Sequence, residues 1–356
     1  MKNKTHFKVI GLMSGTSLDG LDICYCQFQL DDQWSFKIIQ AETLEYPQEM
    51  IERLMESTTL SGQQLTQLDH DLGNYIGKSV QEFVDKYELE VDFISSHGHT
   101  VFHQPENGFT LQIGNINDIS AKTGLPVIGD FRSLDVAHGG QGAPLVPIGD
   151  RLLFADYDYC LNLGGIANIS YENDGDRIAF DISPCNMALN HLAARFGKSY
   201  DHEGSLARSG QVDDSLLRVL NDLPFYSASA PKSLGFEWME KNFFPLLEQK
   251  GYTNEDLLAT CVENFAIQIA RTISKPNTKL LITGGGAFNN YLIERINFHS
   301  GKNTEVIIPN KEVIGFKEAL IFAFLGVLKV TGQSNCLSSV TGASQDTCGG
   351  VSVGFK

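Results

Sequence analysis

Three features are missing from this sequence of 356 residues: Cys-x-x-Cys pairs, long apolar runs and an excess of positive charge. The seven cysteines are scattered, and we interpret them as residues of a reduced, cytoplasmic protein. No apolar run reaches the roughly 20 residues of a membrane span, and the polar stretch 1–8 lacks a signal-peptide pattern. The formal net charge of −16 argues against nucleic acid or an anionic membrane surface as a partner, but not against an anionic substrate.

Common nucleotide and hydrolase motifs are also missing. The sequence has no G-x-G-x-x-G dinucleotide fingerprint and no G-x-S-x-G nucleophile elbow. The stretch from Gly73 to Ser79 resembles a P-loop, but only three residues separate its glycines where the motif needs four. Because it also lies inside a helical apolar pattern (residues 61–87), we interpret it as part of a helix.

The stretch 9–26 reads as strand, glycine turn and strand. Amides and hydroxyls of such a turn can bind phosphate, and Asp19 and Asp22 are suitable ligands for Mg²⁺. The alternative is a plain glycine-rich hairpin. The residues that we expect to bind phosphate here are Gly11, Ser14, Gly15, Thr16, Ser17 and Asp19.

The same order of elements recurs in the second half, where a glycine turn separates strands 158–163 and 166–171. We therefore predict two α/β domains that face each other across a cleft. The predicted domains are residues 1–131 and 132–356, and the C-terminal tail either stays in the second domain or returns to the first. The second-half glycines that we expect to contact phosphate are Gly164, Gly165, Gly284, Gly285 and Gly286.

Asp181, at the end of an apolar strand, is the candidate general base. Its alternative role is to cap the helix that follows. Arg132 suits a substrate carboxylate or phosphate, or a surface ion pair. Glu318 opens an apolar helix, where a carboxylate is either favoured by the helix dipole or directed at a ligand hydroxyl.

Three histidines stand close together at His97, His99 and His103. Their spacing would put them on one face of an extended segment. Because no carboxylate or cysteine follows nearby to complete a zinc site, we favour a polar loop that contacts substrate, or a structural turn, over a metal centre.

Taken together, these motifs resemble the anhydro-N-acetylmuramic acid kinase family. The resemblance is carried by segments spread over most of the chain: residues 11–20 (GLMSGTSLDG), 96–98 (SHG), 100–103 (TVFH), 111–114 (LQIG), 130–132 (DFR), 139–147 (GGQGAPLVP), 162–169 (NLGGIANI), 284–286 (GGG), 318–319 (EA) and 341–343 (TGA). The family usually has Asp-Thr-Gly-Pro-Gly-Asn where this chain has residues 181–186 (DISPCN), and Gln where His99 stands.

The resemblance implies an actin-like sugar kinase with two ribonuclease-H-like domains, ATP and Mg²⁺. It implies that water opens the 1,6-anhydro ring at C1 while O6 takes the γ-phosphate of ATP, in peptidoglycan recycling. The catalytic base maps onto Asp181, Asp19 is the expected Mg²⁺ ligand, and a homodimer is an expected assembly. The residues that we expect to bind the sugar are His97, Arg132, Asn168 and Glu318. The alternatives are a kinase for another sugar and a non-catalytic sugar or nucleotide sensor.

Overall fold

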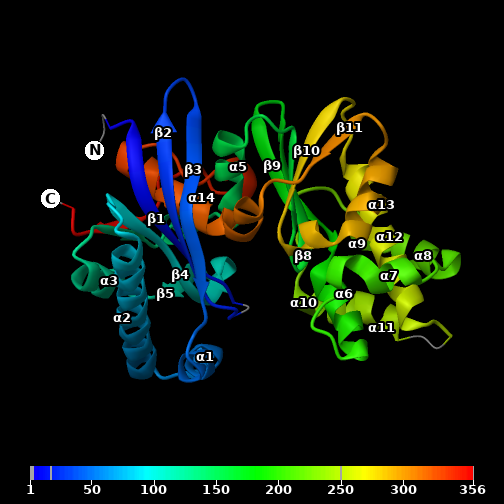
Figure 1. Ribbon diagram of the computed structural model, residues 1–356, viewed down its shortest axis with the longest axis horizontal. Helices are drawn as coiled ribbons and strands as arrows, with labels where there is room; N and C mark the ends of the chain where they lie inside the picture. The colour runs from blue at the N-terminus through cyan, green and yellow to red at the C-terminus, as the bar shows by residue number, and fades with distance from the viewer. Residues whose placement is uncertain (1–3, 17, 249–250, 356) are drawn as a thin grey trace. The chain divides into compact units, whose positions relative to one another are not determined.

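The computed structural model describes residues 4–16, 18–248 and 251–355 (Figure 1). The chain forms two compact α/β units, which confirms the predicted fold class. Unit 1 comprises Met1–Leu153 and Phe316–Lys356, and unit 2 comprises Phe154–Gly315. Within the described ranges, no helix is both long and apolar enough to cross a membrane.

Unit 1 is built on a mixed seven-stranded sheet with the order β12-β6-β4-β1-β2-β3, and β5 pairs with β4. β1, β2 and β3 are antiparallel neighbours, as the opening pattern predicts, whereas β4 lies parallel to β1 and β6 parallel to β4. The strands are β1 His6–Ser14, β2 Leu21–Leu30, β3 Trp34–Leu44, β4 Phe93–Gln104, β5 Phe109–Ile113, β6 Val127–Gly129 and β12 Val351–Val353.

Helices cover both faces of this sheet. Ile10 and Leu12 of β1 pack in one core with the apolar stripe of α2, which begins at a Ser61–Gln64 capping box. Gly11 faces the other way, and a Cβ there would lie 1.9 Å from the Ala319 carbonyl oxygen of α14. The helices are α1 Gln48–Met55, α2 Gly62–Tyr87, α3 Ile116–Thr123, α4 Ser133–Ala137, α5 Val146–Leu153, α14 Lys311–Thr331 and α15 Ser338–Thr341, with 3₁₀ turns η1 Ser57–Thr59 and η2 Pro105–Asn107.

The C-terminal part of the chain belongs to unit 1. Lys317 of α14 forms a buried ion pair with Asp150 of α5 at 2.7 Å, and β12 pairs antiparallel with β6. The predicted division after residue 131 therefore differs from the compact units, because α5 packs with α14 and the chain leaves unit 1 only after Leu153. The loop chosen for the boundary lies inside unit 1.

Unit 2 repeats the strand pattern of unit 1. Its five-stranded sheet has the order β11-β10-β7-β8-β9, with β7, β8 and β9 antiparallel neighbours and β10 and β11 parallel to β7 and to each other. This order matches β6-β4-β1-β2-β3 of unit 1, so the duplication predicted from the sequence is confirmed. The strands are β7 Tyr159–Leu163, β8 Ile166–Asn173, β9 Asp176–Pro184, β10 Thr278–Thr283 and β11 Thr304–Ile307.

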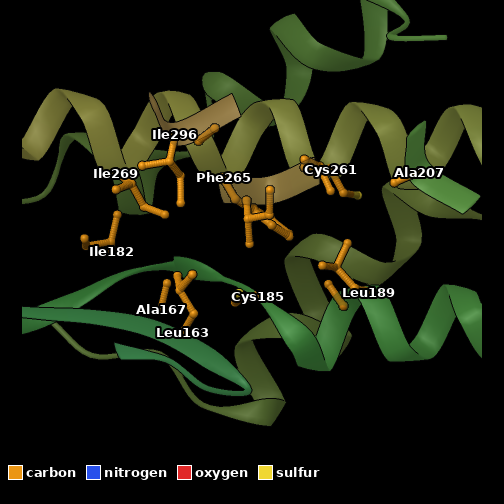
Figure 2. Packing of buried hydrophobic residues seen from close by; sticks show 14 of the residues in the cluster. Leu163, Ala167, Ile182, Cys185, Leu189, Ala207, Cys261, Phe265, Ile269 and Ile296 are labelled. Atoms are coloured by element: carbon orange, nitrogen blue, oxygen red, sulfur yellow. The ribbon is translucent and has the colours of Figure 1, made fainter. Parts of the chain in front are cut away.

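The core of unit 2 lies between its sheet and the long helix α12. Figure 2 shows Leu163, Ala167 and Ile182 of the strands pointing toward Phe265 and Ile269 of α12, and all five are buried. The helices are α6 Asn186–Ala193, α7 Ser205–Ser209, α8 Asp214–Asn221, α9 Pro224–Ser227, α10 Phe236–Trp238, α11 Phe244–Leu247, α12 Asn254–Thr272 and α13 Asn290–Ser300, with single turns η3 Ala194–Phe196, η4 His202–Gly204, η5 Met239–Phe243 and η6 Gly285–Phe288.

Candidate active site

The turn between β1 and β2 exposes only part of the predicted phosphate motif. Gly15, Thr16 and Asp19 reach solvent, and Ser17 lies outside the described residues. Gly11 lies in mid-strand under α14, so the need for glycine there comes from helix packing.

Ser14 is buried and takes part in an internal hydrogen-bond network. Its hydroxyl accepts from the Tyr46 hydroxyl at 2.8 Å and lies 3.1 Å from Nδ1 of His99. Burial raises the pKa of Tyr46 and lowers that of His99, so both side chains stay neutral at pH 7. We conclude that His99 belongs to the hydrogen-bond network beneath the turn.

Three carboxylates of unit 1 interact electrostatically beside this turn. The pKa of Asp22 is raised by burial and by the charge of Asp19, although the Thr43 hydroxyl donates to Asp22 at 2.6 Å and opposes the shift. The pKa of Glu318 is also raised, mainly because protein surrounds the carboxyl, while Arg132 lowers it and Asp22 raises it. Repulsion between like charges therefore adds to burial in raising the pKa of Asp22 and of Glu318.

His97 holds Arg132 in place. The imidazole Nε2 accepts hydrogen bonds from Nε and Nη2 of Arg132 at 3.0 and 2.9 Å, and Nδ1 lies 2.9 Å from the Gly98 carbonyl oxygen. Nδ1 therefore carries the proton, and Nε2 is the acceptor. Burial and the adjacent guanidinium lower the pKa of His97 to about 3, so the imidazole is neutral.

Arg132 is in turn fixed by a second acceptor. Its Nη1 donates to the Gly142 carbonyl oxygen at 2.7 Å, and the amide of Gly142 donates to the buried carboxylate of Asp135 at 2.7 Å. The other oxygen of Asp135 accepts from the Thr341 hydroxyl at 2.8 Å and the Cys336 thiol at 3.1 Å. Asp135 thus ties the glycine-rich loop to the C-terminal part of the chain, a role that sequence reasoning missed because Thr341 lies 206 positions away.

In unit 2, the Gly164–Gly165 turn is covered by the start of α6. The amides of Cys185 and Met187 donate to the Gly165 carbonyl oxygen, and the amide of Asn186 donates to that of Gly164, all within 3.0–3.1 Å. These bonds hold the carbonyl groups of the turn and fix its conformation.

The Gly284–Gly286 triplet packs tightly against the same turn. Gly284 has a φ of +80°, and a Cβ there would lie 2.5 Å from Oδ1 of Asn162. A Cβ on Gly286 would lie 2.6 Å from Cβ of Leu163, whereas a Cβ on Gly285 would meet nothing closer than 3.6 Å. The first and third glycines are therefore required sterically, and the middle one is not.

A row of polar side chains crosses the second sheet on one face. Thr283, Asn162, Asn168 and Asp181 are successive neighbours in the register of β10, β7, β8 and β9. Paired residues on adjacent strands project to the same side, so Asn168 lies beside Asp181. Sequence reasoning identified Asn168 and Asp181 separately but not that they are neighbours.

Asp181 is held at β9 by two backbone hydrogen bonds. Its own amide donates to the Lys232 carbonyl oxygen at 3.0 Å, and the Leu234 amide donates to its Oδ2 at 2.8 Å. Burial raises the pKa of the carboxyl, and the Leu234 amide partly offsets that rise. The hydrogen bond that would make Asp181 a cap of α6 is not formed within the described residues, where the Asp181 carboxylate binds the 230–234 segment instead.

The histidine group does not form a metal centre among residues 4–16, 18–248 and 251–355, where no cluster of three or more His, Cys, Asp or Glu is suited to a metal ion. His97 is engaged by Arg132, and Nδ1 of His103 lies 3.2 Å from the Thr110 hydroxyl. Cys24 and Cys26 are buried and free, with their sulfurs 3.4 Å apart.

Comparison of the sequence with known proteins identifies one family. The family model for anhydro-N-acetylmuramic acid kinase matches residues 7–354. A protein of that name from Aliivibrio fischeri is 36% identical over 360 residues, which cover 95% of this chain and 96% of the relative. Another from Mannheimia succiniciproducens is 34% identical over 371 residues, covering 96% and 97%. Among solved structures, a ROK family glucokinase from Streptomyces griseus in complex with glucose and AMPPNP aligns at 11% identity over 89% of this chain and 98% of its own, with a TM-score of 0.40.

Proposed function

This chain belongs to the anhydro-N-acetylmuramic acid kinase family and is a sugar kinase, and we propose that it opens 1,6-anhydro-N-acetylmuramic acid while it phosphorylates O6. Water adds to C1, the bond from C1 to the bridging oxygen breaks, and that oxygen takes the γ-phosphoryl group of ATP. The products are N-acetylmuramic acid 6-phosphate and ADP. We assign the reaction to peptidoglycan recycling in the cytoplasm.

Asp181 is the proposed base for the attacking water, and its surroundings carry the proposal. Its Oδ2 is fixed by the Leu234 amide, and among the described residues no hydrogen bond occupies Oδ1. Because burial raises the pKa of the carboxyl, it is a stronger base than an exposed aspartate. A proton from water would pass to Oδ1 as the C1–O bond breaks.

Arg132 and Glu318 are the proposed sugar contacts in unit 1. The guanidinium is oriented by His97 and by the Gly142 carbonyl oxygen, which leaves its remaining N–H groups for an anionic or carbonyl group of the substrate. Solvent reaches the Glu318 side chain, and its carboxylate can accept from a sugar hydroxyl. We propose that His97 acts through Arg132, since its Nε2 is already an acceptor for that side chain. Asn168, beside Asp181, is a further proposed sugar contact.

The glycine turns and the acidic pair are the proposed sites for ATP and Mg²⁺. Gly284 and Gly286 are required by packing against Asn162 and Leu163, whereas the open position of Gly285 leaves room for a ligand to approach the backbone there. Asp19 and Asp22 supply oxygen ligands of the kind that Mg²⁺ prefers, and the charge of Asp19 helps to raise the pKa of Asp22, an effect that a bound cation would offset. When bound, Mg²⁺ neutralises charge on the phosphates during transfer.

The test is product analysis in ¹⁸O-labelled water with ATP, Mg²⁺ and the anhydro sugar. We expect a sugar 6-phosphate with one ¹⁸O at C1, and Asp181→Asn to bind ATP and sugar but to lose about 10²- to 10⁴-fold in kcat, the usual contribution of a general base. Asp176→Asn, at the exposed opposite end of β9, is the control and keeps full turnover.

Three other outcomes would contradict the proposal in different ways. Phosphorylation of another sugar alone would reassign the substrate, and sugar binding without ATP consumption would indicate a sensor. Full turnover by Asp181→Asn would remove Asp181 as the base. The homodimer stays a prediction, which sedimentation velocity tests.

A further inference from the structure

The segment 230–234 of unit 2 lies along the free edge of β9, which is the edge strand of the second sheet. It joins α9 to α10 and contacts β9 at Asp181 through the two backbone hydrogen bonds described above. Segment 230–234 has no helix or strand of its own. Side chains of the segment therefore supplement these two hydrogen bonds in holding it on β9.

Lys232 is the charged side chain that anchors the segment, beside the buried Leu234. Its ammonium donates to the carbonyl oxygens of Phe225 and Tyr226 at 3.1 and 3.4 Å. It also lies over the rings of Phe225 and Phe180, 4.7 and 5.8 Å from their centroids. In the part of the chain that the structure describes, no carboxylate forms an ion pair with Lys232. The ammonium is thus held by carbonyl oxygens and aromatic faces, contacts that a partly desolvated cation makes well.

The residues that accept hydrogen bonds from Lys232 are themselves anchored to the core through Tyr226. The Tyr226 hydroxyl donates to Oδ1 of Asn264 at 2.8 Å, and Asn264 is fully buried on α12. The Asn264 amide donates to Oδ1 of Asn221 at 3.0 Å. Lys232 therefore connects a segment without secondary structure to residues that are hydrogen-bonded to the buried helix α12.

A cavity of about 460 Å³ adjoins this anchor and admits solvent to the Lys232 stem. Tyr171, Phe180 and Arg271 are among the residues that line it. Burial lowers the pKa of Lys232, which agrees with an ammonium that is only partly hydrated. The cavity also leaves room for a substituted side chain at 232 without overpacking.

We propose that Lys232 is a positioning residue for Asp181: its ammonium holds the 230–234 segment on β9 and so keeps the Leu234 amide on Oδ2 of the carboxylate. This inference rests on the proposed role of Asp181 as the base. One oxygen is fixed by the amide, which leaves the other directed at water. Without the anchor, the segment moves from β9, the Leu234 hydrogen bond is lost, and the carboxylate turns.

The pKa of Asp181 gives a direct readout that needs no substrate. Burial raises this pKa and the Leu234 amide lowers it, so loss of the amide raises it further. We would measure it by ¹³C NMR of protein labelled at aspartate carboxyl carbons, with Asp181→Asn to assign the signal. Lys232→Met, which keeps the length of the stem, should raise the pKa, and Lys232→Arg should restore it. Lys241→Met, at an exposed lysine of η5, is the matched control.

Kinetics provide the second readout. Lys232→Met should lower kcat about 10- to 100-fold, since misplacing a reacting group by about 1 Å costs up to about 10²-fold, and should move the acidic limb of the kcat profile to higher pH. KM for ATP should stay within about twofold, because the ammonium acts only through Asp181. In an Asp181→Asn background, the same substitution should have no further effect on kcat.

The outcomes separate this inference from the proposed function. An unchanged Asp181 pKa in Lys232→Met overturns the inference even if the protein is an active kinase. A lower kcat without a pKa change, and without rescue by Lys232→Arg, assigns Lys232 a merely structural role and also overturns it. If the wild-type protein does not consume ATP with the anhydro sugar, the proposed function fails, while the NMR titration still decides whether Lys232 holds the Leu234 amide on Asp181.

Discussion

Substitution of Asp135 tests how the loop that carries Arg132 is held. The carboxylate is fully buried and accepts three hydrogen bonds, from the Gly142 amide, the Thr341 hydroxyl and the Cys336 thiol. Burial, together with the hydrogen bond to Asp135, raises the pKa of the Cys336 thiol, so the thiol keeps its proton and donates it. Asp135→Ala removes the acceptor of all three hydrogen bonds at once.

Loss of the Asp135 carboxylate affects the three hydrogen-bond donors unequally. The Thr341 hydroxyl can still donate to the Leu337 carbonyl oxygen at 3.2 Å, and a thiol is a weak donor. The buried Gly142 amide loses the carboxylate that accepts its hydrogen bond at 2.7 Å. An unsatisfied buried amide costs about 1–3 kcal/mol, and the cavity left by the side chain adds to this, so we expect about 3 kcal/mol in total. For a unit of this size, that lowers Tm by about 6–12 °C.

The assay is scanning calorimetry together with steady-state kinetics. We expect Asp135→Ala to unfold at lower temperature and to raise KM for the sugar more than KM for ATP, because the Gly142 carbonyl oxygen orients Arg132. Asp32→Ala, at an exposed aspartate of the same unit, is the control and should melt like the wild type. A Tm of Asp135→Ala within about 1 °C of the wild type would refute the claim that loss of the acceptor for the Gly142 amide destabilises the protein.

Two further predictions concern His97 and the glycine triplet. Since the pKa of His97 is about 3 in the folded state and about 6.5 when unfolded, the unfolded state binds the extra proton between these values. The free energy of unfolding should therefore fall as pH is lowered from about 6.5 toward about 3, and His97→Gln should flatten this dependence in urea titrations, where an equal slope would contradict the assignment. Gly284→Ala should destabilise the protein by about 1–3 kcal/mol from backbone strain alone, with a further steric cost at Asn162, whereas Gly285→Ala should unfold near the wild-type denaturant midpoint. Equal midpoints for the two variants would contradict the steric argument.

Much of the fold follows from local sequence patterns. The opening hairpin, the helix 61–87 and the three strands that begin unit 2 were all predictable because alternating or helical apolar spacing is written into contiguous residues. The repeat of strand order in the two units was predictable for the same reason. The position of the C-terminal part was not, because the Lys317–Asp150 ion pair joins residues 167 positions apart and nothing local indicates it.

The candidate site shows the same division. The positions of charged residues in turns and at strand ends indicated Asp181, Arg132 and Glu318 as candidates. Local sequence did not show that Gly11 and Ser14 belong to the packed interior. A glycine packed under a helix and a glycine that lies near a phosphate cannot be distinguished from the sequence alone.

By itself, then, the sequence determined the α/β class, the duplicated strand order and the residue types available for chemistry, because these depend on contacts between near neighbours in the chain. Only the tertiary structure decided the partners: His97 as the acceptor for Arg132, Asp135 beneath the glycine loop, and the Leu234 amide on Asp181. Each of these bonds joins a residue of a strand or helix to a loop residue between 7 and 53 positions away. Hydrogen bonds of this kind form only where packing brings a buried donor and acceptor together, which no periodic pattern records.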